Sequence, residues 1–115
     1  AGSAVEVAGL KVVASEMEGA DRKALMETAD QLKNKLGEGV VVLATVEDGK
    51  VVLVAGVTKS ATNRIKAGVL MKHLASLVDG KGGGRPDMAQ GGGNDPSRLA
   101  EALAGVPAWV EQNIG

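Results

Sequence analysis

The chain has 115 residues, 17 of them glycine, and a formal net charge of −1 at pH 7. This length suits one domain with a single core, which we place at residues 1–115. There is no cysteine, which excludes disulfides, thiol nucleophiles and thiolate metal sites. No apolar run approaches the roughly 20 residues of a membrane-spanning helix, so we expect a cytoplasmic protein without a membrane segment.

Aromatic residues are nearly absent, since Trp109 is the only Phe, Tyr or Trp. The core must therefore consist of aliphatic side chains, methionine and alanine, and Trp109 is expected in the core or at an interface. The composition also excludes an RNA-binding sheet that stacks single-stranded bases on Phe or Tyr.

The first half of the chain predicts a strand at Leu10–Ala14 and an amphipathic helix at Arg22–Leu36. Apolar residues recur at helical spacing, Asp21 offers an N-cap and Gly37 a stop. The strand, the helix and the next strand would form a β-α-β unit.

Two apolar segments follow, Val40–Val46 and Val51–Val57, separated by the turn sequence Glu47-Asp48-Gly49-Lys50. Asp-Gly is a strong signal for a β-hairpin. Strands that are apolar at nearly every position are usually covered on both faces. The sequence therefore predicts an α/β fold with a mixed central sheet and helices packed on it.

The second half predicts a helix at about Lys66–Val78 and then a glycine-rich loop, Gly80–Gly93. In that loop, Asp87–Gln90 could add a short edge strand. Asp95-Pro96 is typical of a helix start, and Pro107 is expected to end that helix near Gly105 and to begin a last short one.

Positive charge is concentrated in one segment. Residues 59–85 hold six basic side chains against Asp79 alone, whereas the segments before and after are each net acidic. This segment ends in the glycine-rich loop, whose backbone could approach phosphate oxygens or a flat base closely. A flexible surface loop is the alternative interpretation. The spacing fits neither a nucleoside-triphosphate loop nor a dinucleotide fingerprint.

A family resemblance rests on Lys59, Thr62, Arg64, Lys66-Ala67-Gly68 and the motif GKGGGRPDMAQ at residues 80–90. In this order they resemble the C-terminal globular domain of alanyl-tRNA synthetases, a type of domain also found beside the catalytic domain of DHH phosphoesterases. The resemblance covers essentially the whole chain. One departure is Gly91, where the family usually has alanine.

The resemblance implies a domain that contacts the tRNA elbow and supports both aminoacylation and editing of alanine tRNA. The parent enzyme's other domains would be its partners and would bind ATP, Mg and Zn; its dimerising helical segment is absent here, so we expect a monomer. The residues that the resemblance places on the RNA surface are Lys59, Arg64, Lys66, Lys81, Gly82, Gly83, Gly84, Arg85 and Gln90.

No constellation in the chain predicts catalysis or a metal site. His73, the only histidine, is expected to be an exposed bystander, and the carboxylates are scattered. We therefore expect a domain that is not itself an enzyme and holds no cofactor. Two alternatives remain: the substrate phosphate-binding domain of a DHH-type phosphoesterase, which an upstream Asp-His-His motif would favour, and a protein-interaction domain whose glycine-rich loop is incidental.

Overall fold

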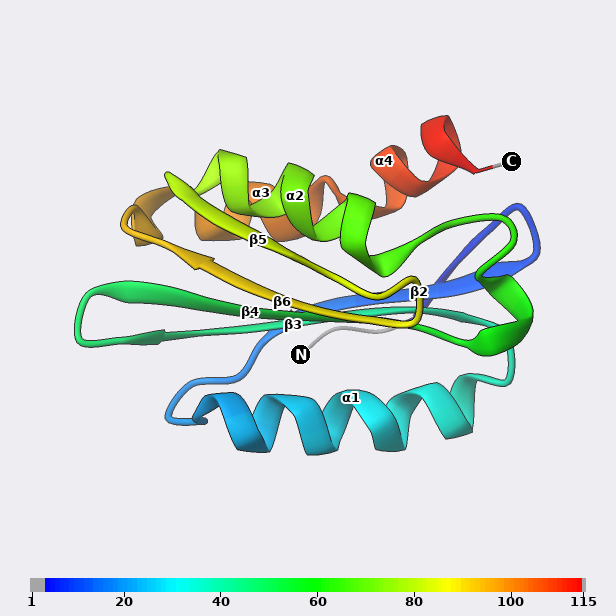
Figure 1. Cartoon of the computed structure of the whole chain (residues 1–115), viewed down its shortest axis with the longest axis horizontal. Coiled ribbons are helices and arrows are strands. Elements are labelled where there is room, and N and C mark those ends of the chain that lie inside the picture. The colour runs from blue at the N-terminus through cyan, green and yellow to red at the C-terminus, as the bar shows by residue number, and fades with distance from the viewer. Residues whose placement is uncertain (1–3, 115) are drawn as a thin grey trace.

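The computed structural model describes residues 4–114, so the outermost ends of the expected domain lie outside the described residues. A mixed sheet lies between α1 on one face and α2, α3 and α4 on the other (Figure 1), which confirms the predicted α/β class. The elements are β1 (Val5–Val7), β2 (Leu10–Glu16), α1 (Arg22–Leu36), β3 (Gly39–Glu47), β4 (Lys50–Val57), a 3-10 turn η1 (Lys59–Ala61), α2 (Ala67–Leu77), β5 (Gly80–Gly84), β6 (Met88–Gly93), a 3-10 turn η2 (Pro96–Arg98), α3 (Leu99–Ala104) and α4 (Val106–Asn113).

Helix α1 has the predicted bounds because both of its ends are encoded locally. Asp21 Oδ1 accepts a hydrogen bond from the Ala24 backbone N–H at 2.8 Å, which satisfies one of the unpaired donors of the first turn. Gly37 ends the helix with φ of 77°, a conformation that L side chains avoid.

The strand order in the sheet is β1-β2-β3-β4-β6-β5. Strands β2 and β3 are parallel and are connected through α1, which confirms the β-α-β unit. The predicted hairpin joins β3 to β4, with Glu47 opposite Lys50 and positive φ at Asp48 and Gly49. The short strand β1, which pairs antiparallel with β2, was not predicted.

The glycine-rich segment is a β-hairpin, and the prediction of a loop is wrong. Strand β6 is not at the edge of the sheet but lies between β4 and β5, and β5 forms the edge. Glycine has low strand propensity because it loses much conformational freedom and offers no side chain to pack. The backbone hydrogen bonds to β4 and the packing of α2 on the hairpin override that preference.

The helices cover the sheet unevenly. Helix α1 lies over β3 and β4, whereas α2 lies over β4, β6 and β5. The core on the α1 face is made by Leu25, Ala29, Val41, Leu43, Val54 and Met88. On that side α1 reaches β6 only at the buried Met88, and the next residue on the same face, Gln90, is exposed, so this face of the glycine hairpin is open beyond Met88.

Asp95-Pro96 starts a helical segment as predicted, but its first turn is the 3-10 turn η2 and α3 follows from Leu99. Asp95 Oδ1 accepts from the Ser97 N–H at 3.1 Å ahead of α3, and Pro107 lies in the first turn of α4. Trp109 of α4 packs against the core and stacks on His73 of α2, with ring centroids 5.4 Å apart. His73 is half-buried in this stack, so the expectation that its side chain is exposed is wrong. None of the described helices is long and apolar enough to cross a membrane.

Candidate nucleic-acid interface

The turn of the glycine hairpin, Arg85–Asp87, is held by three other elements. The Pro86 carbonyl accepts from the Ala67 N–H at 2.8 Å, which fixes the turn to the start of α2. The Asp87 carbonyl accepts from the Val57 N–H at 3.0 Å and from Lys33 Nζ at 3.2 Å. The turn therefore sits rigidly between α1, β4 and α2.

Basic side chains surround this turn. A hollow of about 420 Å³ on its α1 side includes Lys33 and Lys59, together with Asp87 of the turn. A second hollow of about 210 Å³ on its α2 side includes Lys66 and Lys72, together with Pro86. A third, of about 220 Å³, adjoins the second and adds Arg64. We name this region the basic end and define it as Lys33, Lys59, Arg64, Lys66, Lys72 and Arg85.

The charges of the basic end are only lightly engaged within the protein. The Arg85 side chain is 76% exposed, and its Nε lies 3.5 Å from Asp87 Oδ1. Lys66 Nζ donates to the Thr62 carbonyl at 2.9 Å, and Arg64 Nη2 donates to the Ala8 carbonyl at 3.1 Å. Solvated cations of this kind retain donors for phosphate oxygens. Helix α2 begins here with no acidic residue in its first turn, so its dipole adds positive potential.

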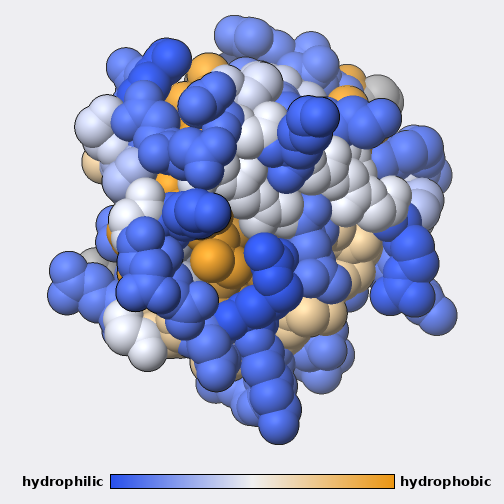
Figure 2. Space-filling view, turned by 60° about the vertical axis from the view of Figure 1, so that its left-hand side comes forward, coloured by the Kyte–Doolittle hydropathy of each residue, from blue (hydrophilic) through white to orange (hydrophobic). Residues whose placement is uncertain are grey.

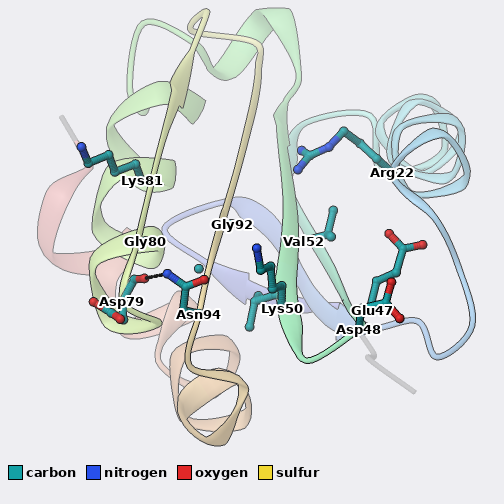
Figure 3. Close-up of a pocket in the computed structure, with 12 residues that line it drawn as sticks. Arg22, Glu47, Asp48, Lys50, Val52, Asp79, Gly80, Lys81, Gly92 and Asn94 are labelled. Carbon is teal, nitrogen blue, oxygen red and sulfur yellow. Dashed lines mark hydrogen bonds between the residues drawn. The ribbon is translucent and has the colours of Figure 1, made fainter.

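Lys81 lies apart from the other predicted cations. It lines an open cleft of about 750 Å³ at the opposite end of the hairpin, and the lining of this cleft also includes Arg22, Lys50 and three acidic residues (Figure 3). The acidic residues of that cleft are Glu47, Asp48 and Asp79. The predicted residues thus form a basic end containing Lys59, Arg64, Lys66 and Arg85, and a separate cleft with mixed charge.

The predicted glycines do not all expose backbone to a ligand. A Cβ at Gly82 would lie 2.7 Å from Met71 Cγ, and one at Gly84 would lie 2.7 Å from the Met88 carbonyl oxygen. These two glycines let α2 and the two strands approach each other. At Gly83 the nearest atom would be Lys72 Cε, at 3.7 Å, an ordinary contact distance. Figure 2 shows a band of surface with intermediate hydropathy, drawn in white, between hydrophilic side chains.

Residues 9–112 match the family model described as the DHHA1 domain. The chain belongs to the DHHA1 domain family. It is 59% identical over 113 residues to an alanine–tRNA ligase of Xanthomonas campestris pv. campestris and 60% identical over 111 residues to that of Ralstonia nicotianae. These matches cover 98% and 96% of the chain, but the chain spans only 13% of the length of either relative.

This DHHA1 domain also resembles a solved structure, the C-Ala domain from Aquifex aeolicus alanyl-tRNA synthetase. The TM-score is 0.88 at 27% sequence identity, and the match covers 95% of this chain and 98% of the other. The family resemblance inferred from the glycine motif is thus confirmed by sequence and by structure.

Three further cations of the DHHA1 domain were not predicted as site residues. Lys33 and Lys72 belong to the basic end, and Arg22 donates to Gln90 Oε1 at 3.2 Å across the open face of the hairpin. Lys72 could have been found from the charge of its segment. The sequence holds no signal that joins Arg22 or Lys33 to their hydrogen-bond partners in the hairpin, which lie 68 and 54 positions away.

The exposed cations of the basic end offer binding chemistry for an anion. Within residues 4–114, no group of three or more His, Cys, Asp or Glu side chains could hold a metal ion. The single histidine stacks on Trp109 instead of facing the hairpin. Exposed cations beside bare strand backbone are suited to a polyanion.

Proposed function

We propose that this DHHA1 domain is the tRNA-binding domain of an alanyl-tRNA synthetase, that it contacts the tRNA elbow, and that it supports aminoacylation and editing of alanine tRNA. Its similarity to segments of two alanine–tRNA ligases and to the C-Ala domain supports this assignment. The rest of such a protein would be an ATP-dependent ligase and would supply the catalytic groups, ATP, Mg and Zn.

The basic end is the observation that carries the proposal. Its cations come from α1, η1, the residues before α2, α2 itself and the hairpin turn, and they line three hollows around that turn. Cations grouped in this way neutralise phosphates of a folded RNA and fix its orientation. No Phe or Tyr is available to stack splayed single-stranded bases. A folded region such as the elbow, where the D and T loops meet, therefore suits this surface.

A binding titration at fixed low salt tests the proposal. The probes are full-length alanine tRNA and an acceptor-stem minihelix that lacks the elbow. We expect clearly tighter binding of the full tRNA. Equal binding of both probes would contradict elbow recognition and leave general attraction between the basic end and duplex RNA. Binding of neither would contradict an RNA-binding role for the domain.

Light scattering during the same titration reports on the oligomeric state, which we expect to be monomeric with and without RNA. We also expect the domain to work in the cytoplasm, with the aminoacylation and editing domains as its partners.

A DHH-type phosphoesterase role is less well supported, because both relatives described above are ligases. Tighter binding of a short nucleotide with a terminal phosphate than of tRNA would favour that alternative.

A further inference from the structure

Arg22 connects helix α1 to the open face of the glycine hairpin. Its Nη1 donates to Gln90 Oε1 at 3.2 Å, and its Nη2 donates to the Gly91 carbonyl at 3.3 Å. As the first residue of α1, directly after the Asp21 cap, Arg22 starts from a fixed backbone position. Figure 3 shows its guanidinium group extending from α1 toward the hairpin strands.

The bond from Arg22 sets the orientation of the Gln90 carboxamide. A carboxamide has one acceptor oxygen and one NH₂ group with two donors. With Oε1 bonded to the guanidinium of Arg22, the Nε2 donors are directed away from it. Within residues 4–114, no group accepts a hydrogen bond from Gln90 Nε2, and the Gln90 side chain is exposed.

The neighbours of Gln90 leave these donors accessible. The residue opposite on β5 is Gly83, and the next residue on the same face of β6 is Gly92, so neither carries a side chain that could cover Nε2. The residue opposite on β4, Val54, is fully buried under α1 and has no polar group. An acceptor atom of a ligand can therefore reach Nε2 across bare backbone.

We infer that Arg22 is a positioning residue, which turns the Gln90 carboxamide outward so that its Nε2 donors bind a hydrogen-bond acceptor of RNA. The acceptor is a phosphate, ribose or base oxygen. This inference rests on the proposed RNA-binding function and adds a neutral contact to it. Arg22 itself acts through Gln90, because its guanidinium is already engaged by Gln90 Oε1 and the Gly91 carbonyl.

The test measures tRNA affinity at several salt concentrations for Gln90→Ala, Arg22→Met and the double variant. We expect Gln90→Ala to bind about threefold to tenfold more weakly, the range for one neutral hydrogen bond. Arg22→Met should lose no more than this, and the double variant should be no weaker than Gln90→Ala alone. The salt dependence should stay unchanged, because no phosphate-bound cation is lost.

Additive losses in the double variant, together with a shallower salt dependence for Arg22→Met, would overturn the inference, because Arg22 would then bind phosphate directly. Gln90→Glu gives a second test that leaves the Arg22 contact in place. It keeps the oxygen that accepts from Arg22 but has no donor, so its loss should at least equal that of Gln90→Ala. Affinity of Gln90→Glu equal to that of the unmodified chain would also overturn the inference.

Gln112→Ala is the matched control. Gln112 is an exposed glutamine on α4, so its substitution should leave tRNA affinity unchanged.

The minihelix locates the RNA acceptor. A Gln90→Ala effect seen only with full tRNA places the acceptor in the elbow, and an effect with both probes places it on the backbone that they share. If the unmodified chain binds tRNA but Gln90→Ala does not weaken binding, this inference fails and the proposed function stands. If the unmodified chain does not bind tRNA, both fail.

Discussion

Gly82 of the hairpin lies directly against Met71 of helix α2. A Cβ at Gly82 would be 2.7 Å from Met71 Cγ and 2.8 Å from the Cα of Gly91 on the neighbouring strand. Met71 is fully buried, so it cannot move away from an added methyl group into solvent. The absence of a side chain at Gly82 is therefore what allows α2 to pack on the hairpin.

Gly82→Ala should lower the free energy of unfolding by about 1–3 kcal/mol, as overpacking of a tight contact does. Urea unfolding followed by the fluorescence of Trp109 gives this value. Gly83→Ala is the matched control, because a Cβ there meets only Lys72 Cε at 3.7 Å. Its stability should stay within about 1 kcal/mol of the unmodified chain, and equal destabilisation by both variants would contradict the packing role of Gly82.

Thr45 on β3 is fully buried, and its Oγ1 has no hydrogen-bond partner within the described chain. Thr45→Val should therefore raise the free energy of unfolding by about 1 kcal/mol, because folding then no longer buries a hydroxyl group that has no hydrogen-bond partner. Thr58→Val is the opposing control. The Thr58 Oγ1 accepts from the Gly39 N–H at 3.0 Å, so its removal should destabilise the protein by about 1–2 kcal/mol. Thermal unfolding by calorimetry would show shifts of opposite sign.

Asp21→Ala removes the N-cap of α1, since Asp21 Oδ1 no longer accepts from the Ala24 N–H. We expect a loss of about 1 kcal/mol of stability, measured by urea unfolding. Asp30→Ala, at an exposed position within the same helix, should cost less than about 0.5 kcal/mol. A larger cost at Asp30 than at Asp21 would contradict the role of the cap.

Arg85→Ala and Lys66→Ala should each weaken tRNA binding without changing the circular dichroism spectrum. If each side chain holds one phosphate, the slope of log affinity against log salt should become shallower by about 0.7–0.9 per variant. Lys35→Ala, which removes an exposed lysine from the last turn of α1, should change neither quantity. Unchanged tRNA affinity in the Arg85 and Lys66 variants would show that the basic end is not the RNA surface.

Lys81→Ala tests the separation of the two groups of cations. Because Lys81 shares its cleft with Glu47, Asp48 and Asp79, we expect a smaller loss of tRNA affinity than for Arg85→Ala. The comparison uses the same titration at the same salt concentration. An equal loss would mean that the RNA surface extends along the whole hairpin.

Elements whose signals lie next to them in the chain could be predicted from the sequence. Helix α1 is bounded by a capping carboxylate at Asp21 and a glycine with positive φ at Gly37, both adjacent to the helix they limit. The β3–β4 hairpin follows from Asp48-Gly49 between two apolar segments. The glycine motif pointed to the family, because its order of residues is specific even though its conformation was predicted wrongly.

The packing role of the glycines and the grouping of the cations depend on contacts between segments that are distant in the chain. The hairpin forms because β6 pairs with β4 and because α2 packs on its glycines, and neither partner is adjacent in sequence. In the same way, Arg22 contacts Gln90, which lies 68 positions later in the chain. Lys81 lies near the start of β5 and Arg85 directly follows its end, so the two cations are separated along the strand. Interactions between distant segments depend on how the sheet and its helices assemble, so they cannot be predicted from the local spacing of residues in the sequence.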